Sequence, residues 1–167
     1  MLSSPDVVSS AWANWPLDRE IVLTRVIDAP VSLVWAAWTD PDQIPVWFGP
    51  AGLEIETREI DLRPGGVWRF DMVGPQMRFS NRMTFLHMEP GVCIEVEQGA
   101  DVDDDPDRFR MLVTFDEQDD GKTVLTLRQM HRDRERRRAT IGFGAVEYGA
   151  QTLDKLERHL LARRAGV

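Results

Sequence analysis

The chain has 167 residues, which fits one domain with a substantial buried core. Its composition, 43% hydrophobic and 29% charged, is that of an ordinary globular protein, and the net charge of −8 argues against nucleic acid as the main partner. No apolar run approaches the roughly 20 residues of a membrane helix, and the first residues lack the basic start and apolar core of a secretory signal. We therefore expect a cytoplasmic protein that binds neither nucleic acid nor membrane.

The first predicted elements are a strand and two short helices. Residues 1–18 look like an extension that precedes a single domain at 19–163. "REIVLTRVIDAP" alternates as a strand does, and "PVSLVWAAWTD" predicts a short helix because Pro30 suits a first helical position. A second helical turn is expected in "PDQIPVWFGPAG", where Pro41 and Pro45 break the chain.

Six further strands are expected from Leu53 onward, where the pattern changes to alternation. They are separated by "PGG", "GPQ", "EPG", the acidic stretch "DVDDDP" and "DDGK", and short connections of this kind imply antiparallel neighbours. We interpret the acidic stretch as a mobile loop, since it lacks the glycine and terminal glutamate of a calcium loop. The six strands are "LEIETREIDLR", "GVWRFDMV", "MRFSNRMTFLHM", "VCIEVEQ", "RFRMLVTFDEQ" and "KTVLTLRQM".

The last predicted element is a long helix over "GFGAVEYGAQTLDKLERHL", residues 142–160, preceded by the arginine-rich "RDRERRR", which we interpret as a solvated loop and first turn. On a helical wheel its buried face is small at the N-terminal end and leucine-rich at the C-terminal end. Either the helix backbone presses closely on the sheet at the glycines, or a cavity lies beneath them. Strand faces rich in Phe, Met and Trp favour a ligand pocket.

The order of elements resembles the helix-grip fold of the START-like (SRPBCC, birch-pollen-allergen-like) superfamily. Within it, "VIDAPVSLVWAAWTDPDQIPVWFGP", "EIDLRPGGVWRF", "MTFLHMEP", "GKTVLTL" and "GAQTLDKLERHL" resemble the branch named after the C-terminal domain of the activator of the heat-shock-90 chaperone ATPase. The resemblance implies an α+β fold in which a curved antiparallel sheet of about seven strands surrounds a long C-terminal helix. It also implies an apolar ligand between sheet and helix. Some superfamily members are cyclases, dehydratases or hydrolases, and the name-giving branch binds the chaperone.

We therefore predict a binding site for an apolar, aromatic or acyl, small molecule beneath the N-terminal half of the last helix. Asn81 and Gln129 interrupt apolar stripes and are either satisfied by backbone or water, or directed at the ligand. The predicted ligand-binding residues are Trp47 and Phe48, which would close one end, and Trp68, Phe70, Asn81, Met83, Phe85, Phe109, Met111, Gln129, Gly142, Ala145 and Gly149.

Residues that could carry chemistry are few, so catalysis is the second hypothesis and a chaperone-interacting module the third. The three histidines lie far apart, and no zinc, nucleotide or nucleophile motif is present, so we expect no metal and no cofactor. Cys93 alternates with apolar neighbours, as a structural thiol would. His131 is the candidate for acid–base work because of its intrinsic pKa, although no carboxylate partner is identifiable. A homodimer remains open.

Overall fold

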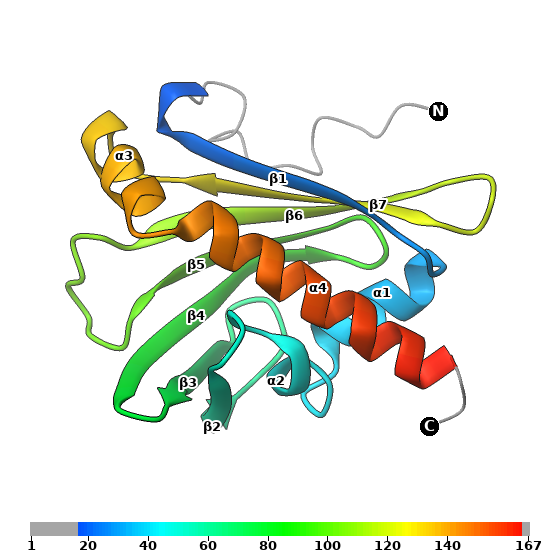
Figure 1. Ribbon diagram of the computed structural model, residues 1–167, viewed down its shortest axis with the longest axis horizontal. Coiled ribbons are helices and arrows are strands. Elements are labelled where there is room, and N and C mark those ends of the chain that lie inside the picture. The colour runs from blue at the N-terminus through cyan, green and yellow to red at the C-terminus, as the bar shows by residue number, and fades with distance from the viewer. Residues whose placement is uncertain (1–16, 165–167) are drawn as a thin grey trace.

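The computed structural model describes residues 17–164. In Figure 1 one long helix lies across one face of a curved sheet, with two short helices beside its C-terminal half and a third at its N-terminal end. The elements in chain order are η3 (Leu17–Arg19), β1 (Glu20–Ile27), α1 (Val31–Thr39), α2 (Ile44–Trp47), β2 (Glu54–Ile60), β3 (Val67–Gly74), β4 (Met77–Glu89), β5 (Cys93–Ala100), β6 (Phe109–Glu117), β7 (Thr123–Met130), α3 (Arg134–Gly142) and α4 (Ala145–Arg164).

The seven strands form one antiparallel sheet in the order β1-β7-β6-β5-β4-β3-β2. Strands β2 to β7 are each hydrogen-bonded to the next in the chain, and β1 closes the row by pairing with β7. The predicted fold class, with two short helices after the first strand and a long C-terminal helix on the sheet, is confirmed. None of the helices between residues 17 and 164 is long and apolar enough to cross a membrane.

The core lies between the inner face of the sheet and the helices. Alternation along β3 and β4 turns Trp68, Phe70, Met83 and Phe85 inward, and each is at most 1% exposed. The C-terminal half of α4 covers this face with three buried leucines, which are Leu153, Leu156 and Leu160. Helices α1 and α2 add the rings of Trp38 and Trp47, whose centroids lie 4.8 Å apart at 69° to each other.

The predicted long helix over residues 142–160 is confirmed from Ala145 onward as α4, but its first residues belong to the end of α3 and to a break. Helix α3 ends at Gly142 and α4 begins at Ala145, because Gly144 has a φ of +97°, a left-handed conformation that ends helices. Gly142 is exposed, and a Cβ built on it would meet no atom within 4 Å. The placement of Gly142 on the buried arc of one continuous helix was therefore wrong.

The two charged stretches differ in how far they match the prediction. The stretch "RDRERRR" is a loop that leads into α3, and five of its seven residues are exposed, as a solvated loop and first turn would be. One of its side chains is nevertheless engaged, since Arg137 donates to the backbone carbonyl of Glu20 over 2.6 Å. In the acidic stretch, Asp101 accepts hydrogen bonds from Arg58 over 2.8 Å and Arg82 over 2.9 Å, so this loop is anchored to β2 and β4, unlike the mobile loop that we expected.

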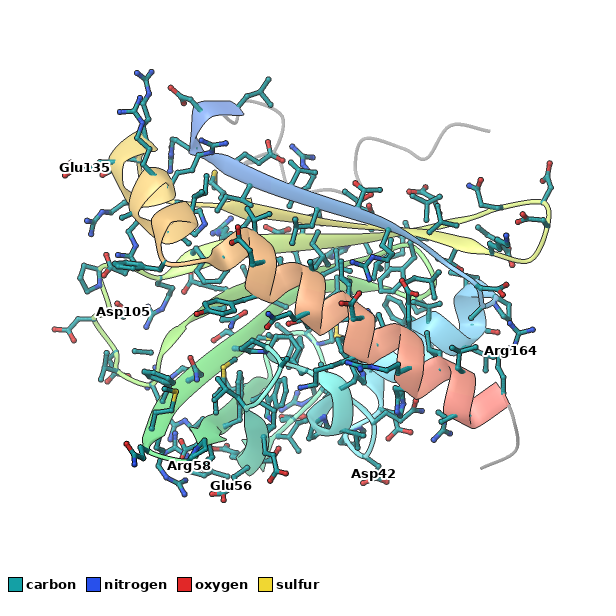
Figure 2. The ribbon with its side chains drawn as sticks, viewed as in Figure 1. Asp42, Glu56, Arg58, Asp105, Glu135 and Arg164 are labelled. Atoms are coloured by element: carbon teal, nitrogen blue, oxygen red, sulfur yellow. The ribbon has the colours of Figure 1, made fainter. Side chains whose placement is uncertain are left out.

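Strand β2 forms one edge of the sheet and is highly charged. Its sequence, "EIETREI", carries four charged side chains, and its register with β3 shifts between Thr57 and Glu59. Such a shift is a β-bulge, in which the extra residue, here Arg58, is unpaired in the ladder. Figure 2 shows Glu56 and Arg58 at this margin of the molecule.

Candidate functional site

An apolar cavity of about 290 Å³ lies between the sheet and the N-terminal half of α4. Strands β5, β6 and β7 form its floor, α4 covers it, and the loop after α2 closes one side. We call this space the apolar cavity. It is lined by Trp38, Phe48, Gly49, Pro50, Met72, Gln98, Phe109, Met111, Leu127, Gln129, Thr140, Ala145, Tyr148, Gly149 and Thr152.

The strand register places the floor side chains in rows. Gln98 of β5 lies opposite Phe109 of β6, and Met111 of β6 lies opposite Gln129 of β7. Residues directly opposite each other point to the same face of the sheet. Each row therefore combines one apolar side chain with one amide, a pattern typical of ligand sites in which a few polar groups orient an apolar molecule.

The loop that closes one side is fixed to α4. The Lys155 ammonium group donates to the backbone carbonyls of Phe48 (3.3 Å), Gly49 (3.2 Å) and Pro50 (3.5 Å). The Gln151 side chain accepts from the Ala51 backbone N–H over 3.1 Å. Burial lowers the pKa of Lys155, against a smaller raising effect of Glu54. Lys155 and Gln151 of α4 thus hold in place the loop with which Phe48 was predicted to close one end of the site.

The sequence left open whether the glycines of the last helix allow close packing on the sheet or border a cavity. At Gly149 both occur. A Cβ built on Gly149 would lie 2.2 Å from Cδ1 of Leu23 on β1, so the helix backbone presses closely on the sheet there. The same residue also borders the apolar cavity. At this residue α4 therefore packs closely against Leu23 of β1 and also borders the apolar cavity.

The predicted ligand-binding residues fall into three groups. Phe48, Phe109, Met111, Gln129, Ala145 and Gly149 line the apolar cavity. Trp47, Trp68, Phe70, Met83 and Phe85 belong to the filled core, where each is at most 1% exposed. Asn81 and Gly142 lie outside the apolar cavity: Asn81 borders a second, polar cavity described below and donates from its side-chain amide to the Phe79 carbonyl over 2.9 Å, and Gly142 is at the exposed end of α3.

Several lining residues were not among those predicted. Tyr148 lies three residues after Ala145, so it shares that face of α4, and helical spacing could have identified it. Met72 and Leu127 continue the inward alternation of β3 and β7, and Gln98 continues that of β5. Thr140 gave no such signal, because its position depends on the break between α3 and α4.

A second, polar cavity of about 180 Å³ adjoins the first beneath α3. It includes Asp105, which Figure 2 shows in the loop between β5 and β6. We call this space the polar cavity. It is lined by Asn81, Gln98, Gly99, Ala100, Asp105, Asp107, Phe109, His131, Arg136 and Thr140.

His131 is the buried titratable group of this cavity. It is 1% exposed, and its ring lies 5.1 Å from that of Phe109. Burial, together with the charges of Arg136 and Arg137, lowers its pKa from 6.5 to about 4, so the ring is neutral at pH 7. Neither ring nitrogen has a hydrogen-bond partner among residues 17–164. No carboxylate in that part of the chain pairs with it as an acid–base partner would.

Two other features lie outside the apolar and polar cavities. His87, Glu89 and Cys93 place their ligand atoms within 4.8 Å of one another, but burial raises the pKa of the Cys93 thiol to about 11, which opposes the thiolate that metals bind. A larger hollow of about 570 Å³, lined by Pro45, Val46, Ala51, Gly52, Leu53, Glu54, Ile55, Lys155 and Arg158, lies between α2, β2 and α4. It is bordered by exposed and charged side chains, unlike an apolar ligand site.

Comparison with known proteins agrees with this architecture. The family model described as "Activator of Hsp90 ATPase homolog 1-like protein" matches residues 28–161. Protein NE0264 from Nitrosomonas europaea is similar in structure, with a TM-score of 0.78 and 25% identity over 90% of this chain and 99% of its own. Protein Ms6760 from Mycobacterium smegmatis has a TM-score of 0.78 and 23% identity over 90% and 96% of the two chains. A search of curated proteins found no match.

Proposed function

This chain belongs to the family of Activator of Hsp90 ATPase homolog 1-like proteins, and from that premise we propose that it binds a small apolar molecule in the apolar cavity. The volume of about 290 Å³ is at the small end of known ligand sites, which favours one or two rings or a short acyl chain.

The observation that carries the proposal is the composition of the lining. Four aromatic side chains and two thioethers converge around one space: Trp38, Phe48, Phe109, Tyr148, Met72 and Met111. Methionine adapts its shape to irregular contents, and aromatic faces offer large contact area to a ring. The lining residues come from α1, the loop after α2, four strands, α3 and α4, so distant parts of the chain contribute to one largely apolar surface.

The test is uptake of naphthalene, an apolar molecule of two rings, by the purified full chain, measured by isothermal titration calorimetry. Ala145→Leu adds bulk to the lining at the first residue of α4 and should weaken uptake at least tenfold. Ala162→Leu is the matched control, because it makes the same change at an exposed position of the same helix. Equal uptake by the parent and Ala145→Leu would contradict the proposal, as would equal losses in both variants.

A further inference from the structure

We propose that the ligand carries a terminal hydroxyl group, phenolic or alcoholic, which His131 binds in the polar cavity while the apolar body fills the apolar cavity. This inference rests on the proposed function and adds the chemical class of the ligand. It depends on three observations: the two cavities are neighbours, the ring nitrogens of His131 lack a partner among the described residues, and two aspartates line the polar cavity beside it.

The two cavities share three lining residues, Gln98, Phe109 and Thr140. Phe109 contributes to both, and its ring is also the one against which His131 packs. One molecule can therefore extend from the apolar cavity past Phe109 toward the imidazole. Its apolar part would contact Met111 and Tyr148, and its end would reach a polar environment.

His131 is held rigidly at that end. Its backbone N–H donates to the Arg19 carbonyl over 3.0 Å, and the Arg19 side chain donates back to the His131 carbonyl over 2.8 Å. Buried polar atoms are nearly always hydrogen-bonded, yet both ring nitrogens lack a partner within the described part of the chain. A neutral imidazole offers one donor and one acceptor, and a hydroxyl group is the simplest ligand group that can accept from one or donate to the other.

Two of the neighbouring charges, those of Asp105 and Asp107, oppose a carboxylate in this position. Both residues line the same cavity, and the Asp105 carboxylate accepts from the backbone N–H groups of Ala100 (2.8 Å) and Asp107 (2.9 Å). Arg136 faces Asp107 at 3.4 Å, and its Nε, which lacks a partner among the described residues, remains a donor. A bound anion would gain this donor but would meet both aspartates, whereas a neutral hydroxyl can use the same donor without that repulsion.

The experiment compares naphthalene, 2-naphthol and 2-naphthoic acid as probes of the purified full chain at pH 7. We expect 2-naphthol to bind about tenfold more tightly than naphthalene, which corresponds to about 1.4 kcal/mol. His131→Phe keeps an aromatic ring but removes both nitrogens, so it should abolish this preference while leaving naphthalene affinity within about threefold. His87→Phe makes the same change outside both cavities, so it is the control and should retain the preference.

A second measurement does not depend on the folding of a variant. In ¹⁵N-labelled parent protein, which has only three histidines, 2-naphthol should shift the His131 ring nitrogens and naphthalene should leave them nearly unchanged. Equal binding of naphthalene and 2-naphthol, tighter binding of 2-naphthoic acid, or a preference that survives in His131→Phe would overturn the inference alone. Failure of the parent to bind naphthalene at all would instead refute the proposed function.

Discussion

Replacing Gly149 by alanine adds a methyl group on the side of α4 that presses on β1. The new Cβ would lie 2.2 Å from Leu23 Cδ1, whereas carbon atoms in contact prefer about 3.5–4.0 Å. Leu23 would have to move its side-chain end, and overpacking of this kind costs about 1–3 kcal/mol. Removing a glycine from a helix interior returns about 1 kcal/mol. We therefore expect Gly149→Ala to destabilise the protein by about 1 kcal/mol.

A double-mutant cycle isolates the cause of this change. In a Leu23→Ala background the steric conflict is absent, so Gly149→Ala should become stabilising by about 1 kcal/mol through helix propensity alone. The coupling free energy between the two positions would then be about 2 kcal/mol, well beyond the roughly 0.5 kcal/mol expected of independent sites. Gly142→Ala is the control, because a Cβ there meets open space.

Urea denaturation at pH 7 measures all four members of the cycle, and thermal melts provide a check, since 1 kcal/mol corresponds to roughly 2–4 °C at this chain length. The reasoning would be refuted if Gly149→Ala stabilised the parent by its full helix propensity. Equal destabilisation with and without Leu23 would likewise show that the methyl group meets something other than that side chain.

Three further predictions concern single positions. Gly66→Ala should destabilise the protein by more than about 3 kcal/mol or prevent folding, because its Cβ would lie 2.0 Å from the Asp61 backbone carbonyl oxygen, which cannot rotate away. Gly65→Ala is the control: its Cβ would meet open space, so only the φ of +83° should cost about 1 kcal/mol in a parallel thermal melt. The free energy of unfolding should fall by about 3 kcal/mol as pH drops from 6.5 through 4, because burial lowers the pKa of His131 to about 4 and the unfolded chain therefore binds the proton first. Urea denaturation at a series of pH values measures this loss, and His131→Phe should reduce its slope. An unchanged slope in the variant would exclude His131 as the source. Asp133→Ala should cost about 1 kcal/mol in urea, because the Asp133 side chain caps α3 by accepting from the Arg136 backbone N–H over 2.7 Å; no loss would mean that the cap is replaced by solvent.

Alternation predicted the orientation of strand residues well. The inward sequence Leu125, Leu127, Gln129 and His131 along β7 follows from period two, and the structure has all four on the inner face or in the cavities. What alternation cannot supply is whether an inward side chain meets another side chain or open volume. Trp68 and Phe70 were therefore predicted as cavity wall, although they stack on each other in the filled core at a centroid distance of 4.0 Å.

The glycines of the last helix were difficult for a different reason. Helical spacing treats each glycine as a position on one wheel, whereas Gly144 ends α3 through a backbone conformation that spacing does not encode. Alternation places His131 inward, but its full burial could not be predicted, because it follows the last residue of β7 and precedes five arginines within residues 132–138. Its environment is created by Phe109 and by α3, which depend on the tertiary structure.

Strand β2 has a consequence for how copies of this molecule meet in concentrated solution. An unpaired strand edge can template another strand, and such templating is the usual route to fibrils. On β2 an incoming strand would have to lie beside Glu54, Glu56 and Glu59 and would lose its ladder at the bulge around Arg58. The like charges would repel an identical edge, and the bulge would interrupt its hydrogen bonds. This margin of the sheet is thereby protected against growth by strand addition.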